Sequence, residues 1–317
     1  MKMRWAVVSL IDILIRLFGQ GAYIFSYFLG WRFVSITGKV IGSIFYVLFV
    51  KKRKIIEEEL NTIFFNRFDS KKIKDVTKRS FENYYMRQME TIFFGSLNKK
   101  ILDKIIHVEG LRNLDIALSE GKGVILLLSH FGSFLLPLPF LGFMGYKINQ
   151  VTGKQKHTSV FAERIWEWRK NEADRLPVRF IQVDAFLRPI YESLKSNEIV
   201  AIAFDGKDGS KYQQVRLLNG TALVSPGPIN LALKTGAAII PTFIVRKNKF
   251  SHRLILGKPF EFIKSGPAEN VIFENTERYS QLFADFISKY PCHYGVILQI
   301  MRKDSEKRIA KPFSLNK

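Results

Sequence analysis

Two short apolar stretches, each ending in a polar side chain, decide the fold of this chain. The first reads GVILLLSH (residues 123–130) and the second reads IVAIAFD (residues 199–205). Runs of this length that are rich in Val, Ile and Leu are typical of strands buried on both faces, as in a parallel sheet. Because the carboxyl ends of parallel strands open onto one crevice, His130 and Asp205 are expected to face each other there.

Further strands and helices are predicted to alternate around these two stretches. Strands are expected at residues 147–151, 178–183 and 238–245, and helices at residues 134–143, 160–174, 185–196, 228–235 and 273–290. A charged segment, residues 51–91, is also expected to be helical. This alternation predicts an α/β fold with a mostly parallel central sheet flanked by helices.

The composition favours an anionic partner. The 317 residues include 49 Lys and Arg against 28 Asp and Glu, a formal net charge of +21. That charge would attract anionic lipid, an acidic carrier protein, a nucleotide cofactor or nucleic acid, although a generally basic proteome would give the same balance. Basic residues interleaved with 28 Phe favour a membrane surface over nucleic acid. The single cysteine, Cys292, excludes an intrachain disulfide and indicates a reducing compartment.

The first fifty residues are predicted to be a membrane anchor, which divides the chain into segments 1–50 and 51–317. The longest uncharged run, residues 17–31, lies between Arg16 and Arg32 and could form a short spanning helix. A helix lying in the interface, with Asp12 and Arg16 on its wet side, is the alternative. The cluster KKRK (residues 51–54) follows and is expected to stay on the cytoplasmic side.

Two segments resemble the lipid A biosynthesis acyltransferases, a branch of the lysophospholipid acyltransferase superfamily. SHFGSF (residues 129–134) begins like the family motif of His, four residues, then Asp or Glu. GTALVSPGP (residues 220–228) and LALKTGAAIIP (residues 231–241) resemble the family's Gly-Pro pair, its Leu-Ala helix and its Thr-Gly-Ala turn. The sequence departs from the family at Leu135, which stands where the motif has its acid, and at DGK (residues 205–207).

The resemblance implies an O-acyltransferase at the bacterial inner membrane, with its catalytic domain facing the cytoplasm. Such an enzyme moves a fatty acyl chain from acyl carrier protein or coenzyme A, as co-substrate, to a hydroxyl of a lipid or glycolipid, without a bound cofactor or metal. His130 would be the general base. Asp205 is the candidate to orient its ring in place of the missing acid, and Asp184 is a second candidate. The alternative role of Asp205 is to cap the turn that follows it.

Six further residues are candidates for holding substrate. Gly132 and Ser133 are predicted to open a helix whose free amides could hold an oxyanion and whose positive end would favour a neutral imidazole at position 130. Four basic residues are candidates to bind anionic groups of the substrates: Lys154 and Arg169 from the resemblance, and Lys207 and Arg216 from their place after the Asp205 strand. The alternative is that they are ordinary solvated surface residues. The apolar segment 134–141 would either pack in the core or line an acyl-chain groove.

Other enzyme classes lack their sequence signatures here. The chain has no Gly-x-Ser-x-Gly elbow, no phosphate-binding loop, no dinucleotide glycine fingerprint and no histidine pair at helical spacing. Since the motif acid is absent, the main alternative is a protein of the acyltransferase fold that binds lipid or a partner without catalysis.

Overall fold

The core of the molecule is a seven-stranded sheet with the strand order β1-β9-β8-β2-β5-β3-β4. The computed structural model describes residues 30–64, 66–153, 163, 167, 170–182, 187–206 and 211–298. All neighbouring strands are parallel except β8 and β9, which are antiparallel. The strands are β1 Ile106–Glu109, β2 Val124–Leu128, β3 Ile148–Thr152, β4 Arg179–Gln182, β5 Ile199–Ala203, β8 Ala238–Arg246 and β9 His252–Leu256. The predicted α/β fold with a mostly parallel sheet is confirmed.

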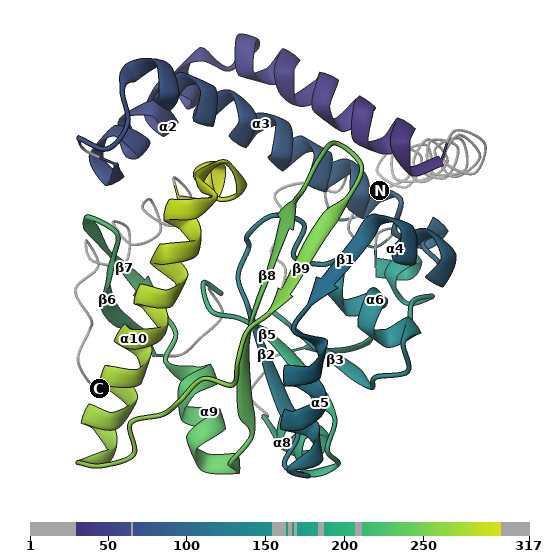
Figure 1. The fold of residues 1–317 in the computed structure, drawn as a ribbon, viewed down its shortest axis with the longest axis vertical. Coiled ribbons are helices and arrows are strands. Elements are labelled where there is room, and N and C mark those ends of the chain that lie inside the picture. Colours follow the sequence, from purple (N-terminus) through teal and green to yellow (C-terminus); the bar gives the residue numbers. More distant parts are fainter. Residues whose placement is uncertain are drawn as a thin grey trace, which may run out of the picture.

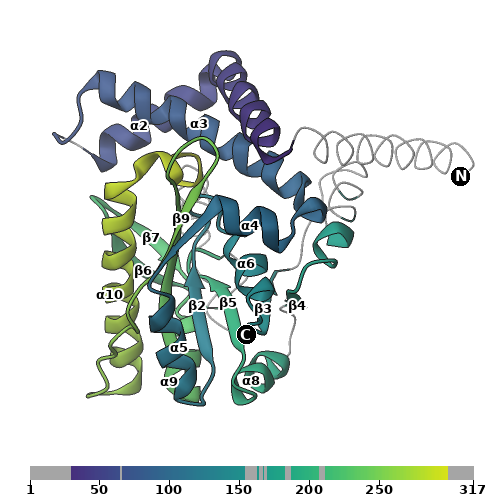
Figure 2. The same cartoon turned by 45° about the vertical axis from the view of Figure 1, so that its right-hand side comes forward.

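Helices cover both faces of the sheet and one of its ends. They are α2 Val50–Ile63, α3 Ser70–Ile92, α4 Lys99–Ile105, α5 Leu111–Ser119, α6 Pro137–Phe143, α8 Arg188–Lys195, α9 Gly227–Thr235 and α10 Ala268–Lys289. In Figures 1 and 2, α10 runs along one side of the sheet, while α4 and α6 lie on the other. The helix Gly30–Leu48, α2 and α3 form a layer across one end of the sheet (Figure 1).

The strand β2 separates two hydrophobic cores. Ile125 and Leu127 belong to the cluster formed with α8, α9 and α10, whereas Val124, Leu126 and Leu128 belong to the cluster formed with α4, α5 and α6. Successive side chains of a strand point to opposite faces, so a strand that is apolar at every position must be covered on both sides. The uninterrupted apolar run that predicted this strand is therefore explained by its central place.

Most predicted elements are present, with shifted ends. All five predicted strands occur within one or two residues of the expected bounds, and the charged segment 51–91 forms α2 and α3. The helix expected at residues 134–143 begins only at Pro137. The helix expected at 160–174 falls largely outside the described residues, although residues 163, 167 and 170–173 are helical. The sequence did not predict β1, β9, α4, α5 or the hairpin of β6 Gln213–Leu217 and β7 Gly220–Val224.

The helix Gly30–Leu48 packs closely against α3. A Cβ atom added to Gly38 would lie 2.5 Å from the Cα of Met86, and one added to Gly42 would lie 2.6 Å from the Cα of Glu82. Ser43 also donates a hydrogen bond of 2.9 Å to Glu82. This helix is long and apolar enough to cross a membrane, with a mean hydropathy of 1.2, and 22% of its most apolar window is buried. The division into an anchor (1–50) and a catalytic domain (51–317) stays a prediction.

Replacement of Gly38 by Ala should lower the free energy of unfolding by about 1–3 kcal/mol, because the added methyl group meets the α3 backbone. In an isolated helix the same change would stabilise by about 1 kcal/mol, so the sign of the effect is informative. Denaturant unfolding followed by circular dichroism measures it. Gly220→Ala is the control, since its nearest neighbour atom would lie 3.9 Å from the new Cβ. A stabilising Gly38→Ala would contradict the packing.

Candidate active site

His130 and Asp205 meet at the carboxyl ends of the neighbouring strands β2 and β5. Leu128 pairs with Ala203 at the ends of these strands, so the residues that follow are brought side by side. The Nδ1 atom of His130 lies 3.0 Å from Oδ1 of Asp205. The backbone N–H of His130 also donates to both carboxylate oxygens, at 3.0 and 3.1 Å. The predicted meeting of these two residues is confirmed.

The pair combines a buried acid with an accessible ring. The side chain of Asp205 is 0% exposed, whereas that of His130 is 38% exposed. Burial raises the pKa of the Asp205 carboxyl, but the charge of His130 and hydrogen bonds from His130 and Tyr294 outweigh this and leave the pKa below its ordinary value. An ionised carboxylate only accepts, so the hydrogen atom between the two side chains is on Nδ1. In the uncharged form of the ring this leaves the lone pair on Nε2. This is the geometry of an oriented general base.

Tyr294 completes the support of Asp205. Its hydroxyl donates a hydrogen bond of 2.6 Å to Oδ2, the second carboxylate oxygen. Tyr294 is fully buried, and burial together with the negative charge of Asp205 raises its pKa well above 10. The carboxylate of Asp205 is thus engaged by His130 and Tyr294, which argues against a role restricted to capping its own turn. Sequence reasoning missed Tyr294, although the segment YPCHY (residues 290–294) is a local concentration of polar aromatic residues.

A second buried carboxylate, Glu90 of α3, lies behind the motif. It binds Arg246 at 2.6 Å and accepts a hydrogen bond of 2.5 Å from the hydroxyl of Ser133. Nε2 of His252 lies 3.5 Å from it. Burial alone would raise the pKa of Glu90. The charges of Arg246 and His252 and the hydrogen bond from Ser133 outweigh burial and bring the pKa down to about 2. The side chain of Ser133 is therefore committed to a structural network.

The predicted role of Gly132 as a free donor is wrong. Its N–H donates to the carbonyl of His293 at 3.2 Å, and its φ of +57° with the carbonyl of Ile244 close by leaves no room for a side chain. The helix expected to open here begins at Pro137, so its positive end does not adjoin His130. Three backbone amides remain without an acceptor among the described residues, those of Ser133, Phe134 and Leu135.

Arg87 joins the long helix α3 to the motif. Its guanidinium donates to the backbone carbonyl of His130 at 3.1 Å and lies over the ring of Phe134, 5.5 Å from the centroid. Burial lowers the pKa of Arg87 from its ordinary value, but a guanidinium retains its charge. The segment from His130 to Ser133 is consequently held by α3 at both ends, through Arg87 at the carbonyl of His130 and Glu90 at the hydroxyl of Ser133.

Of the remaining predicted residues, Arg216 is described by the structure and does not join this cluster. Arg216 lies in β6, where its backbone N–H donates to Glu277 at 3.1 and 3.3 Å and its carbonyl accepts from Ser280, so the hairpin packs on α10. Lys154, Arg169, Lys207 and Asp184 lie outside the described residues. Among the described residues, no group of three or more His, Cys, Asp and Glu could hold a metal ion.

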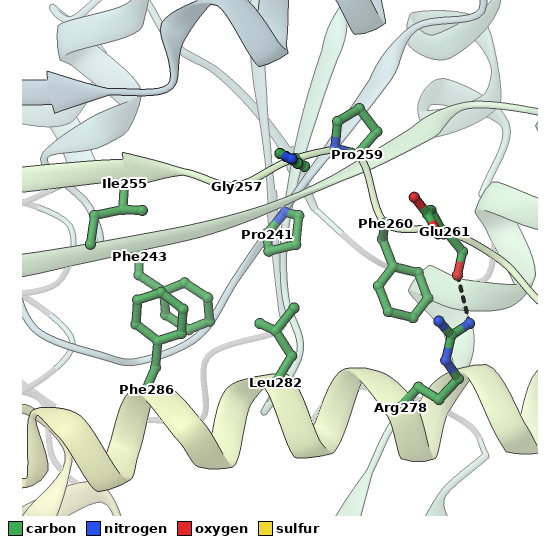
Figure 3. A pocket seen from close by; sticks show the side chains of 11 residues that line it. Pro241, Phe243, Ile255, Gly257, Pro259, Phe260, Glu261, Arg278, Leu282 and Phe286 are labelled. Atoms are coloured by element: carbon green, nitrogen blue, oxygen red, sulfur yellow. Dashed lines mark hydrogen bonds between the residues drawn. The ribbon is translucent and has the colours of Figure 1, made fainter.

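A groove of about 350 Å³ lies apart from this pair, between the β8–β9 strands and α10 (Figure 3). Phe243 and Phe286 stack in its wall, and Arg278 donates to the carbonyl of Glu261 at its rim. Neither His130 nor Asp205 lines it. The groove is linked to the His130 motif only indirectly. The rings of Phe243 and Phe131 meet edge to face, with their centroids 5.9 Å apart.

A family model described as bacterial lipid A biosynthesis acyltransferase matches residues 2–303. The chain belongs to this family. A search among curated proteins gives no match. Membership in the lipid A biosynthesis acyltransferase family makes the chain an acyltransferase, with a lipid acceptor and an acyl thioester donor in general, and the apolar helix near its start points to membrane association.

Truncation of Glu90 should destabilise the fold strongly. Glu90→Ala leaves the buried guanidinium of Arg246 without its partner, which costs about 3–5 kcal/mol of unfolding free energy. The matched control is Glu192→Ala, which breaks the exposed pair with Arg188 and should cost less than about 1 kcal/mol. Denaturant titration of both variants provides the comparison. Equal effects would contradict the structural role of Glu90.

Stability should fall on mild acidification because His293 is held neutral. Burial, followed by the charge of Arg246, lowers its pKa from 6.5 to about 3, and its Nε2 accepts the N–H of Arg246. The unfolded chain thus binds a proton that the folded chain does not. This part of the free energy of unfolding is fully present above pH 6.5 and is lost as the pH falls toward 3, by up to about 1.4 kcal/mol per pH unit.

Thermal unfolding midpoints at several pH values between about 7.5 and 5.5 test this dependence. Burial also lowers the pKa of His252, so its contribution has the same sign. His293→Gln keeps an acceptor for Arg246 and should show a shallower slope. His107→Gln, at an exposed position of β1, should leave the slope unchanged. A wild-type slope equal to that of His293→Gln would refute the assignment.

Proposed function

We propose that this chain is a membrane-associated O-acyltransferase in which His130 is the general base. The observation that carries this proposal is the His130–Asp205 pair, an accessible imidazole held through Nδ1 by a buried carboxylate at 3.0 Å. Family membership supports the class of reaction. Asp205 takes the place of the acid that the family motif has at position 135, and Tyr294 fixes the position of Asp205.

The reaction proceeds in two steps. Nε2 of His130 takes the proton of an acceptor hydroxyl as its oxygen attacks the carbonyl carbon of the thioester, and the carbonyl electrons move to oxygen to form a tetrahedral oxyanion. The oxyanion then collapses and breaks the carbon–sulfur bond. The departing sulfur takes the proton from the imidazolium, which gives an ester and a free thiol. The negative charge of Asp205 stabilises the transient imidazolium.

Backbone amides after the motif supply the candidate oxyanion donors. The N–H groups of Ser133, Phe134 and Leu135 find no acceptor among the described residues, and they follow His130 by three to five positions. Donors arranged before the reaction stabilise the charge that develops on the carbonyl oxygen. They replace Gly132, whose amide is occupied by His293.

The net charge of the chain and its family suggest the acyl donor and the acyl acceptor. A formal net charge of +21 suits acyl carrier protein or coenzyme A, either of which would be a co-substrate rather than a bound cofactor. Lys154, Arg169, Lys207 and Arg216 stay candidates for the anionic groups of these substrates. The acceptor is a hydroxyl of a lipid or glycolipid at the inner membrane, and the catalytic domain faces the cytoplasm.

Replacement of the base should abolish acyl transfer while the fold persists. His130→Ala is expected to reduce kcat by about 10²–10⁴-fold, and Asp205→Asn, which keeps the shape of the side chain, should do so to a similar extent. Purified protein in detergent, with acyl carrier protein or coenzyme A thioesters and lipid acceptors, provides the assay. Circular dichroism confirms folding.

His107→Ala is the control, because this exposed histidine of β1 lies outside the site and should leave the rate unchanged. An unchanged rate for His130→Ala would overturn the catalytic assignment. Should the wild type transfer no acyl group to any lipid acceptor, the alternative of a lipid-binding protein of this fold would be favoured.

A further inference from the structure

The outer face of the helix Gly30–Leu48 is an apolar stripe. Every exposed residue from position 36 to position 50 is a large apolar one. Seven of the twelve large apolar side chains that are exposed in the described residues lie in this stripe, namely Ile36, Val40, Ile44, Val47, Leu48, Phe49 and Val50. A helix facing water would have polar residues on this side. The stripe therefore needs a nonaqueous partner.

The opposite face of the same helix is fixed to α3. Gly38 and Gly42 bring the two backbones together, and Lys39 pairs with Glu82 across the contact at 3.9 Å. The stretch of α3 around these contacts carries the charged residues Arg79, Glu82 and Arg87. If the helix Gly30–Leu48 crossed a bilayer, it would draw these charges into hydrocarbon, which costs several kcal/mol for each. The attachment to α3 argues against spanning.

Basic side chains stand at both ends of the stripe. Arg32 precedes it, and Lys51 and Lys54 follow it, all of them exposed. An apolar strip with cations at its ends complements the apolar interior and the anionic headgroups of a membrane surface. A protein partner would need no such arrangement of charge, and the chain as a whole carries +21.

We propose that the helix Gly30–Leu48 lies in the plane of an anionic bilayer, with this stripe in the headgroup–acyl boundary and α3 on its cytoplasmic side. Figure 2 shows the helix lying across the end of the molecule rather than projecting from it. Arg87 and Glu90 of α3 bind the carbonyl of His130 and the hydroxyl of Ser133. The same arrangement therefore sets the lipid surface over the end of the sheet that carries the His130–Asp205 pair.

The depth of single labels in the membrane tests this orientation. A fluorescent probe is attached to Cys in the full chain at Ile36→Cys, Val40→Cys or Ile44→Cys, with phosphatidylcholine vesicles containing phosphatidylglycerol and quenchers placed at different depths. All three probes should report one shallow depth, about 5–10 Å below the headgroups. In a spanning helix, positions 36 and 44 would differ in depth by about 12 Å.

Ile116→Cys is the matched control, because Ile116 of α5 and Ile36 are both 49% exposed, and α5 lies at the other end of the sheet. Its probe should stay in water. Native Cys292 is buried and its thiol pKa is raised by burial, so wild-type protein gives the labelling background. Probes on the stripe that stay in water with vesicles, that are shielded without them, or that differ in depth by a full crossing would overturn the proposal. The readout requires no acyl transfer, so it is independent of the proposed chemistry.

Discussion

The buried carboxylate of Asp205 is the constraint on which the rest of the site depends. It accepts hydrogen bonds from the backbone and ring of His130 and from the hydroxyl of Tyr294, so it joins two central strands to the segment after α10. A buried charge is costly unless it is fully paired. The partners that make burial of Asp205 tolerable are thus the same groups that fix the orientation of the imidazole. The same hydrogen bonds therefore contribute both to the stability of the fold and to the geometry of the ring.

A second buried carboxylate, Glu90, supports the same loop at Ser133, three residues after His130. Glu90 neutralises Arg246 and holds Ser133, while Arg87, one helical turn before it, holds the carbonyl of His130. The two acids act on successive parts of one loop, Asp205 at His130 and Glu90 at Ser133. Because α3 contributes Arg87 and Glu90, the loop after β2 is fixed to a helix as well as to the sheet. Rigid support of this kind is what a general base requires in order to stay aligned with its substrate.

The sequence was sufficient for five of the seven strands of the sheet and for the His130–Asp205 pair, but not for the surroundings of that pair. The runs before His130 and Asp205 are apolar at every position, so their burial and parallel pairing follow from pattern alone. Tyr294 lies 89 positions from Asp205, and Arg246 lies 156 positions from Glu90, so no local period reports these contacts. Gly132 was misread because its amide partner, the carbonyl of His293, comes from a segment distant in the chain. The strand β9 was not predicted because it begins with His252, a polar residue that is nevertheless fully buried.

The position of α3 links the lipid surface to the chemistry. One side of this helix accepts Gly38 and Gly42, and its last turns hold the His130 motif, so a membrane that contacts the helix Gly30–Leu48 is separated from the motif by a single helix layer. A lipid acceptor has its hydroxyl groups near the headgroups, and a soluble thioester arrives from the water. An enzyme that acts on both substrates needs a general base that is accessible at the membrane–water boundary and an acid that is shielded from water. The 38% exposure of the His130 side chain beside the 0% exposure of Asp205 meets both requirements in adjacent residues.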